Sequence, residues 1–163
     1  MVAQDFSRDQ VLAWLSEVPD PEIPVLTIMD LGIVRDVVVN GEVVVSLTPT
    51  YIGCPATEVI EQSVIDALHE QGVEHVSIER VLSPPWTTDW ISDVGRDKLR
   101  DYGIAPPEAG ASKRALLPGE RPIACPRCNS VDTSLVSEFG STACKASYKC
   151  VACLEPFEYF KCI

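Results

Sequence analysis

The sequence carries two C-x2-C motifs near its C-terminal end. They read CPRC at residues 125–128 and CVAC at residues 150–153, and 21 residues separate them. Two such knuckles at this separation bring four thiolates to one tetrahedral point, the arrangement in which proteins hold structural zinc. We therefore expect Cys125, Cys128, Cys150 and Cys153 to bind one metal ion.

The identity of this metal does not follow from four thiolates alone. Zinc is the default, but the same ligands also hold a single iron or an iron–sulfur cluster. A module of roughly 40 residues builds little core, so we expect the metal to supply much of its folding free energy. Cys144 and Cys162 lie in the same module. We expect them to pack there, and their joining the site would favour a cluster.

Cys54 is of chemical interest because of its position before Pro55, where the turn TPTYIGCP gives way to a helix-periodic run. Proline suits the first helical position, which predicts Cys54 as the N-cap. Free backbone N–H groups and the positive end of the helix dipole would there favour a thiolate over a thiol. The alternative is that a small side chain closes the turn, and the local sequence does not separate the two.

The turn Asp20-Pro21-Glu22 offers carboxylates that could lie near the same sheet edge, although such a segment is more often an ordered turn. Carboxylates beside a thiolate raise its pKa unless the groups share a metal. The two histidines, His69 and His75, show no ligand spacing with the cysteines, so we expect them to be solvated or structural.

The elements that position these residues begin with a helix and a hairpin. Ser7 and Gln10 stand at capping-box spacing, which predicts a helix over about residues 8–17. Two valine-rich runs flank Asn40-Gly41, the strongest short hairpin signal. A two-residue turn there gives the hairpin one apolar face, made of Val34, Val38, Val43, Val45 and Leu47.

A helix after Cys54 should cover that face. Its apolar residues recur at helical spacing, and they are Val59, Ile60, Val64, Ala67 and Leu68. A third strand follows in HVSIERVL, and then a short helix over about residues 91–102. We therefore predict an α+β fold. It has a small two-layer helix/sheet domain over residues 1–103, a linker over 104–122 and a zinc-ribbon-like metal-binding module over 123–163.

Composition narrows the classes of function. The 163 residues are 46% hydrophobic, and no stretch approaches the roughly 20 apolar residues of a membrane span. The net charge is -11, and residues 119–163 hold equal numbers of acidic and basic residues, so the first 118 carry the acidic excess. This charge argues against nucleic-acid binding. Seven cysteines without a signal peptide indicate a cytoplasmic, metal-binding protein that is not anchored in a membrane.

No motif of the nucleotide hydrolases, Rossmann enzymes, α/β-hydrolases or zincin proteases is present, so the chain is not expected to be catalytic alone.

The segments DPEIP, DLGIV, TPTYIGCPA, SPPWTTDW and YGIAPP, followed by CPRC and FGSTACKASYKCVACLEPFEYFKC, resemble the PaaD family. Its members are small accessory components of the bacterial phenylacetyl-CoA epoxidase (ring 1,2-monooxygenase) system. The likeness runs from about Pro19 to the C-terminus. The first domain also resembles the broader SufT-type family of iron–sulfur assembly proteins, of which the D-P-E turn and the G-C-P cysteine are signatures.

The resemblance implies a role in aerobic phenylacetate catabolism beside an oxygenase and a reductase. It makes Cys54 the candidate thiolate for transient binding of iron or an iron–sulfur cluster, with Asp20 and Glu22 as nearby supports. The resemblance leaves the mechanism open, and our first hypothesis is a maturation factor that assists cofactor assembly in a partner subunit. The competing interpretation is a structural or electron-transfer subunit of the oxygenase complex with iron at its C-terminal cysteines.

Overall fold

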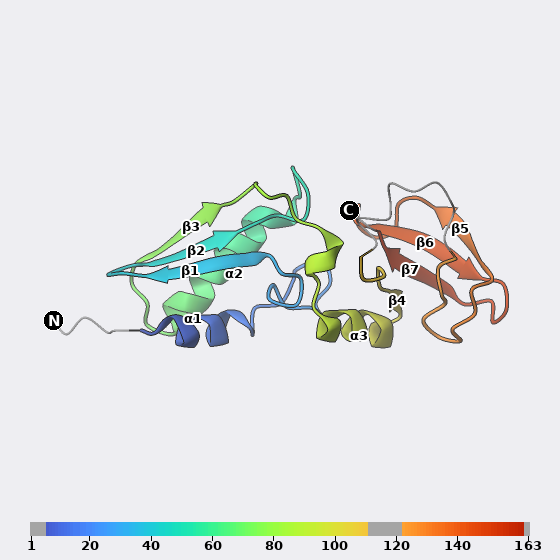
Figure 1. Ribbon diagram of the computed structural model, residues 1–163, viewed down its shortest axis with the longest axis horizontal. Coiled ribbons are helices and arrows are strands. Elements are labelled where there is room, and N and C mark those ends of the chain that lie inside the picture. Colours follow the sequence, from blue (N-terminus) through green and yellow to red (C-terminus); the bar gives the residue numbers. More distant parts are fainter. Residues whose placement is uncertain (1–5, 111–121, 162–163) are drawn as a thin grey trace. The chain divides into compact units, whose positions relative to one another are not determined.

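The computed structural model describes residues 6–110 and 122–161, and the chain divides between Trp86 and Thr87 into two compact units (Figure 1). We call residues 1–86 the first unit and residues 87–163 the second unit. The mixed α+β class expected from the sequence is confirmed. Among the described residues, no helix is both long enough and apolar enough to cross a membrane.

The first unit is a three-stranded sheet packed against two helices (Figure 1). Strands β1 (Val34–Val39) and β2 (Val43–Leu47) are antiparallel, and β3 (Val76–Arg80) lies parallel to β2 in the order β1-β2-β3. Helix α2 (Ala56–Glu70) provides the crossover that a parallel pair of strands needs. Helix α1 (Arg8–Leu15) packs against α2 and β1.

Both helices begin close to where the sequence predicted. Ser7 and Gln10 form the expected capping box, with the Ser7 hydroxyl accepting from the Gln10 backbone N–H at 3.2 Å. The buried stripe of α2 recurs every four residues and consists of Ala56, Ile60, Val64 and Leu68. The expectation that Val59 belongs to this stripe was wrong, because it lies one residue off the repeat and is 50% exposed.

The hairpin register differs from the expected one by a residue. Val39 pairs with Val43, so the loop has three residues, with Gly41 at φ +74°. A three-residue hairpin loop with glycine in the left-handed region is a standard alternative to the two-residue turn. With this register the Val37 side chain points into the core and is 1% exposed. The Val38 side chain, which was expected in the core, is 49% exposed. A bulge near the start of β1 then pairs Val34 with Leu47, which is the pair that a two-residue turn would also give.

The second unit is built around a four-stranded sheet in the order β4-β7-β6-β5 (Figure 1). It comprises a 3-10 turn (Thr88–Trp90), α3 (Asp93–Tyr102), β4 (Ile104–Ala105), β5 (Thr133–Ser137), β6 (Lys145–Cys150) and β7 (Pro156–Phe160). The chain thus divides earlier than the expected bounds of 103 and 123, and β4 starts inside the expected linker by pairing in parallel with β7. Residues 111–121 of that linker lie outside the described residues.

Candidate metal centre and exposed thiol

The two cysteine knuckles have the same backbone geometry. In the first, the Cys125 N–H donates to the carbonyl five residues later at 2.9 Å, and Asn129 has a φ of +63°. In the second, the Cys150 N–H donates to the carbonyl of Glu155 at 2.9 Å, and Leu154 has a φ of +64°. Each C-x2-C segment therefore curls into the same tight turn, which points both of its sulfurs to one side.

The four sulfurs converge on one point. The Sγ atoms of Cys125 and Cys153 lie 3.8 Å apart, those of Cys128 and Cys150 lie 3.5 Å apart, and all four lie within 4.8 Å of one another. A tetrahedral ion with metal–sulfur bonds of about 2.3 Å needs sulfurs about 3.8 Å apart. The site therefore fits a single thiolate-bound ion, because a cluster would spread its ligands over several irons.

Burial and hydrogen bonding make the four thiols unequal. Cys125 and Cys150 are buried, whereas Cys128 and Cys153 are exposed. The backbone N–H of Cys153 donates to the Cys150 sulfur at 3.5 Å, and this hydrogen bond is the main cause that lowers the pKa of Cys150 to about 7. This hydrogen bond favours the thiolate form of Cys150, which is the form that binds a metal.

The core around this centre is small. Ala105, Cys125, Cys150 and Phe157 are its buried members. The Tyr148 ring stacks on Phe157 with centroids 5.9 Å apart and helps to cover them. Because two of the four buried members are candidate ligands, a metal that joins the knuckles would contribute directly to the stability of this part of the fold.

Cys54 lies in the connection from β2 to α2, at the end of a tight turn. Its backbone N–H donates to the Tyr51 carbonyl at 3.2 Å, and Gly53 takes a φ of +83°, as the third residue of a type II turn requires. The predicted N-cap role was wrong by one residue. Pro55 is the N-cap and already has helical dihedrals, and α2 begins at Ala56 without a side-chain cap.

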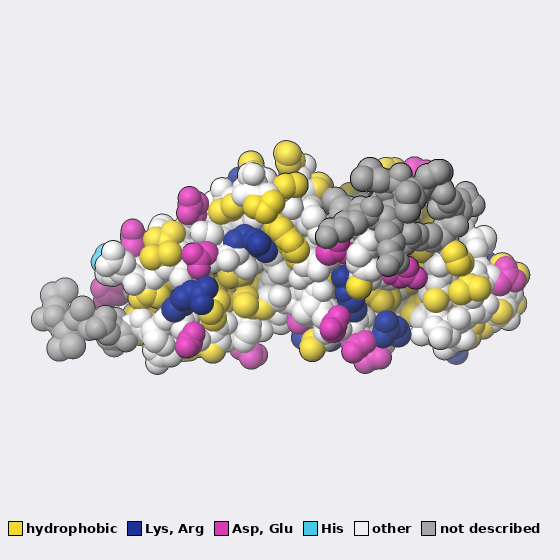
Figure 2. All heavy atoms as spheres, in the orientation of Figure 1, with side chains coloured by type: hydrophobic (Ala, Val, Ile, Leu, Met, Phe, Trp, Pro, Cys, Tyr) yellow, Lys and Arg dark blue, Asp and Glu magenta, His cyan; other side chains and the backbone are white. Residues whose placement is uncertain are grey.

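The thiol of Cys54 is free and partly exposed. Two residues earlier, Ile52 is 88% exposed, and Val59 on the first turns of α2 is half exposed. Figure 2 shows hydrophobic side chains gathered over the loop that leads into α2. Our sequence reasoning missed Ile52. The available signal was a large apolar residue inside a Gly- and Pro-rich turn, where no helix or strand period accounts for it.

Asp20 organises the acidic turn from inside. It is 6% exposed, and its Oδ1 accepts the backbone N–H groups of Glu22 at 2.9 Å and Ile23 at 2.7 Å. Its own N–H donates to the Leu26 carbonyl at 2.8 Å. The Asp20 carboxylate therefore holds the turn that presents Glu22, which is partly buried.

The four knuckle cysteines are the one group of three or more Cys, His, Asp or Glu side chains that converges among the described residues. The structure does not bring Cys54, Asp20 and Glu22 together in such a group. Cys144 also stays outside the four-cysteine cluster. It is buried, with its sulfur 3.0 Å from the Thr142 hydroxyl, as packing predicts. Cys162 lies outside the described residues.

Comparison with known proteins divides the chain into two matching regions. Residues 8–79 match the model of the iron-sulfur cluster assembly protein family, and residues 109–161 match the PaaD zinc beta ribbon domain. Over 155 residues the chain is 56% identical to an Escherichia coli (strain K12) protein that is named as a 1,2-phenylacetyl-CoA epoxidase subunit. This match covers 94% of the chain and 92% of that protein.

Other relatives match the N-terminal part. A protein of Porphyromonas gingivalis, named an Fe-S protein maturation auxiliary factor, is 34% identical over 90 residues, which are 53% of this chain and 85% of that protein. A crystal structure of a domain of unknown function from Bacillus anthracis is 30% identical, with a TM-score of 0.53. The match covers 56% of this chain and 90% of the chain in that structure. The structure of a conserved hypothetical protein from Thermotoga maritima is 30% identical, with a TM-score of 0.51. The match covers 59% of this chain and 96% of that protein's chain.

Proposed function

The chain belongs to the PaaD family, and we propose that it is an accessory maturation factor of the phenylacetyl-CoA epoxidase system in aerobic phenylacetate catabolism. In this proposal it assists the assembly of an iron–sulfur or iron cofactor in a partner subunit, in the cytoplasm. The observation that carries the proposal is the free, partly exposed thiol of Cys54. It lies two residues after the exposed Ile52, inside the region that matches the iron–sulfur assembly family.

Cys54 is the residue that would hold the cargo. Thiolate sulfur is the ligand that iron–sulfur clusters use, and a single protein thiolate leaves the remaining iron positions to other ligands. Transfer is then a ligand exchange, in which a partner's thiolate forms a bond to iron as the Cys54–iron bond breaks, with no change in oxidation state. The tight turn from Tyr51 to Cys54 fixes the backbone of the donor, and Asp20 holds the separate turn that presents Glu22.

The four-cysteine module serves docking in this proposal. Zinc on Cys125, Cys128, Cys150 and Cys153 would tie the two knuckles together, giving the reductase or oxygenase subunit a rigid surface to recognise. Ile52 provides an apolar contact for the subunit that receives the cargo, since burying an isoleucine is worth about 2 kcal/mol.

The proposal is tested by coexpressing the chain with the oxygenase and reductase subunits and measuring iron and sulfide in each purified subunit. Cys54→Ser should leave the fold and the metal of the four-cysteine site intact but lower the cofactor content of the partner. Cys144→Ala, which removes a thiol outside both sites, should leave that content unchanged. Normal cofactor content with Cys54→Ser would contradict the proposal.

A second pair of variants separates docking from metal handling. Ile52→Asp should weaken binding to the partner, whereas Val38→Asp should not, because Val38 is a half-exposed valine on β1. The four-cysteine site also fits a single iron, which leaves the electron-transfer interpretation as a competing outcome. Iron retained at that site in both cysteine variants, with colour that bleaches on reduction, would support electron transfer instead.

A further inference from the structure

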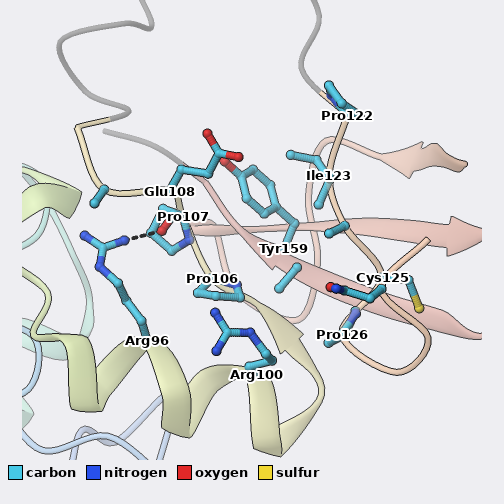
Figure 3. Close-up of a pocket in the computed structure, with 14 residues that line it drawn as sticks. Arg96, Arg100, Pro106, Pro107, Glu108, Pro122, Ile123, Cys125, Pro126 and Tyr159 are labelled. Atoms are coloured by element: carbon cyan, nitrogen blue, oxygen red, sulfur yellow. Dashed lines mark hydrogen bonds between the residues drawn. The ribbon is translucent and has the colours of Figure 1, made fainter. Parts of the chain in front are cut away.

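The second unit contains a pocket of about 280 Å³ beside the first cysteine knuckle (Figure 3). Its walls come from α3, from the segment after β4, from residues 122–126 and from β7. The apolar part of the lining includes Pro106, Ile123, Pro126 and Tyr159. Figure 3 shows the sulfur of Cys125 turned away from Pro106, so a ligand here would not compete for the metal.

One side of the pocket is positively charged. Arg96 is 8% exposed, and its guanidinium donates to the carbonyls of Pro107 and Thr88. Among the described residues, no carboxylate forms an ion pair with Arg96. A buried guanidinium bonded to carbonyls keeps its full charge, and this charge favours an anion nearby.

Arg100 follows one turn later on α3 and also lines the pocket. Its side chain is half exposed and pairs with Asp97 at 2.7 Å. An exposed pair of this kind contributes little, so the guanidinium can turn to a second carboxylate at small cost. Arg96 therefore fixes the wall at Pro107, and Arg100 is the cation available to a ligand.

Glu108 adds an acidic side chain to the wall of the pocket. Figure 3 shows it on the far side of Pro106 from Arg100. We propose that the pocket binds a monocarboxylate with a compact aromatic or apolar tail, its carboxylate on Arg100 and its tail against Ile123 and Tyr159. The chemistry fits a free carboxylic acid or the C-terminal carboxylate of a partner protein. This site lies in a different unit from Cys54 and goes beyond the proposed maturation function.

The test is a titration of the zinc-loaded full chain, followed by the backbone amide signals in NMR. The first probe is 3-phenylpropionate and its control is the matching amide, 3-phenylpropionamide. We expect saturable shifts at Ala105, Ala109, Ala124 and Asn129, which line the pocket. The amide should bind about tenfold more weakly, because it loses a charge-assisted hydrogen bond. Equal binding of acid and amide, or no saturable shifts at these residues, would overturn the proposal.

Variants test whether the carboxylate of the ligand binds to Arg100. Arg100→Ala should weaken binding of 3-phenylpropionate about tenfold. The matched control is Arg8→Ala, since Arg8 is similarly exposed and ion-paired but lies in the first unit. Glu108→Gln should strengthen binding of the dicarboxylate phenylsuccinate. An unchanged affinity in Arg100→Ala would contradict the assignment.

A second probe identifies the source of the carboxylate. Acetyl-Gly-Phe with a free carboxylate is compared with its C-terminal amide. Tighter binding of the peptide acid than of 3-phenylpropionate would assign the pocket to a partner's C-terminus, and weaker binding would assign it to a small acid.

Discussion

The ion pair between Lys145 and Glu158 gives the sharpest prediction about stability. The Lys145 Nζ and the Glu158 Oε2 lie 3.0 Å apart, with the lysine side chain 5% exposed and the glutamate side chain 27% exposed. The same carboxylate accepts the backbone N–H of Ser141 at 2.6 Å and its hydroxyl at 3.1 Å. It therefore ties β6, β7 and the connection from β5 to one point.

Glu158→Gln keeps an acceptor for Ser141 but removes the charge that neutralises Lys145. Breaking a buried ion pair by removing one partner costs about 3–5 kcal/mol. Glu158 is partly exposed and glutamine retains hydrogen bonds, so we expect a loss of about 2 kcal/mol in the free energy of unfolding of the second unit. The double variant Lys145→Met/Glu158→Met should lose less than the sum of its single variants, because no unpaired charge remains.

The contribution of Glu158 to the stability of the second unit should depend on pH with a definite sign. Burial raises the pKa of Glu158, but the Ser141 N–H and the Lys145 ammonium outweigh it and hold that pKa below its ordinary value of 4.5. The carboxylate thus contributes stability above pH 4.5, and this contribution disappears as the pH falls through the lowered pKa. The carboxyl carbon signal of Glu158 should titrate below pH 4.5 in wild type and at a higher pH in Lys145→Met than in wild type, because the lysine charge no longer favours the carboxylate.

The assay is urea unfolding of the zinc-loaded chain, followed by the amide signals of β6 and β7, with those of β1 and β2 as an internal control. In Glu158→Gln, the unfolding midpoints reported by the amide signals of the second unit should move to lower urea concentration, and those of the first unit should not move. A loss below about 0.5 kcal/mol, or additive losses in the double variant, would refute the reasoning, since such values are typical of exposed pairs.

Three other perturbations have definite expected outcomes. A zinc chelator should collapse the amide signals of β5, β6 and β7 and leave those of β1 to β3; retained signals in both units would contradict a metal-dependent module. Gly140→Ala should destabilise the second unit by about 1 kcal/mol in urea unfolding, because its Cβ would lie 2.5 Å from the Oε1 of the Glu158 carboxylate, which Ser141 and Lys145 hold in place, and an unchanged midpoint would contradict a fixed carboxylate. Asp20→Ala should cost the first unit about 1–2 kcal/mol, whereas Asp20→Asn should keep most of that stability, because it retains the acceptor for two N–H groups. Equal losses would show that charge matters more than turn geometry.

The metal centre was predictable because its geometry is local. Each C-x2-C segment forms its own turn, and the spacing of the two motifs allows a hairpin to bring them together. The position of Cys54 at the start of α2 was predictable to within one residue, since Gly53 and Pro55 restrict the backbone on both sides. In both cases the informative residues are neighbours in the sequence.

The hairpin register was not predictable from hydrophobicity. Val37, Val38 and Val39 are consecutive, so a shift by one residue exchanges one valine for another in the core. The choice depends on the loop, in which the Asn40 N–H donates to the Glu42 carbonyl.

Contacts between distant segments could not be predicted either. β4 has two residues and sits in a Pro-rich stretch typical of a linker, and its strand character comes from pairing with β7. The pairing of Lys145 with Glu158 depends on the β6–β7 register, which no pattern in the sequence specifies. Arg96 is a charged residue on a predicted helix, so nothing in the sequence indicated that it would be buried. Its guanidinium can be buried because it donates to the carbonyls of Thr88, before α3, and of Pro107, after α3.

The central claim is that Cys54 holds iron as cargo while the four-cysteine site keeps its own metal. The most direct measurement is the content of zinc, iron and sulfide per chain after anaerobic incubation with ferrous iron and sulfide, for wild type and Cys54→Ser. We predict about one zinc per chain in both, and iron in wild type that is absent from Cys54→Ser. Equal iron in the two proteins would contradict the claim, because the iron would then be bound without Cys54.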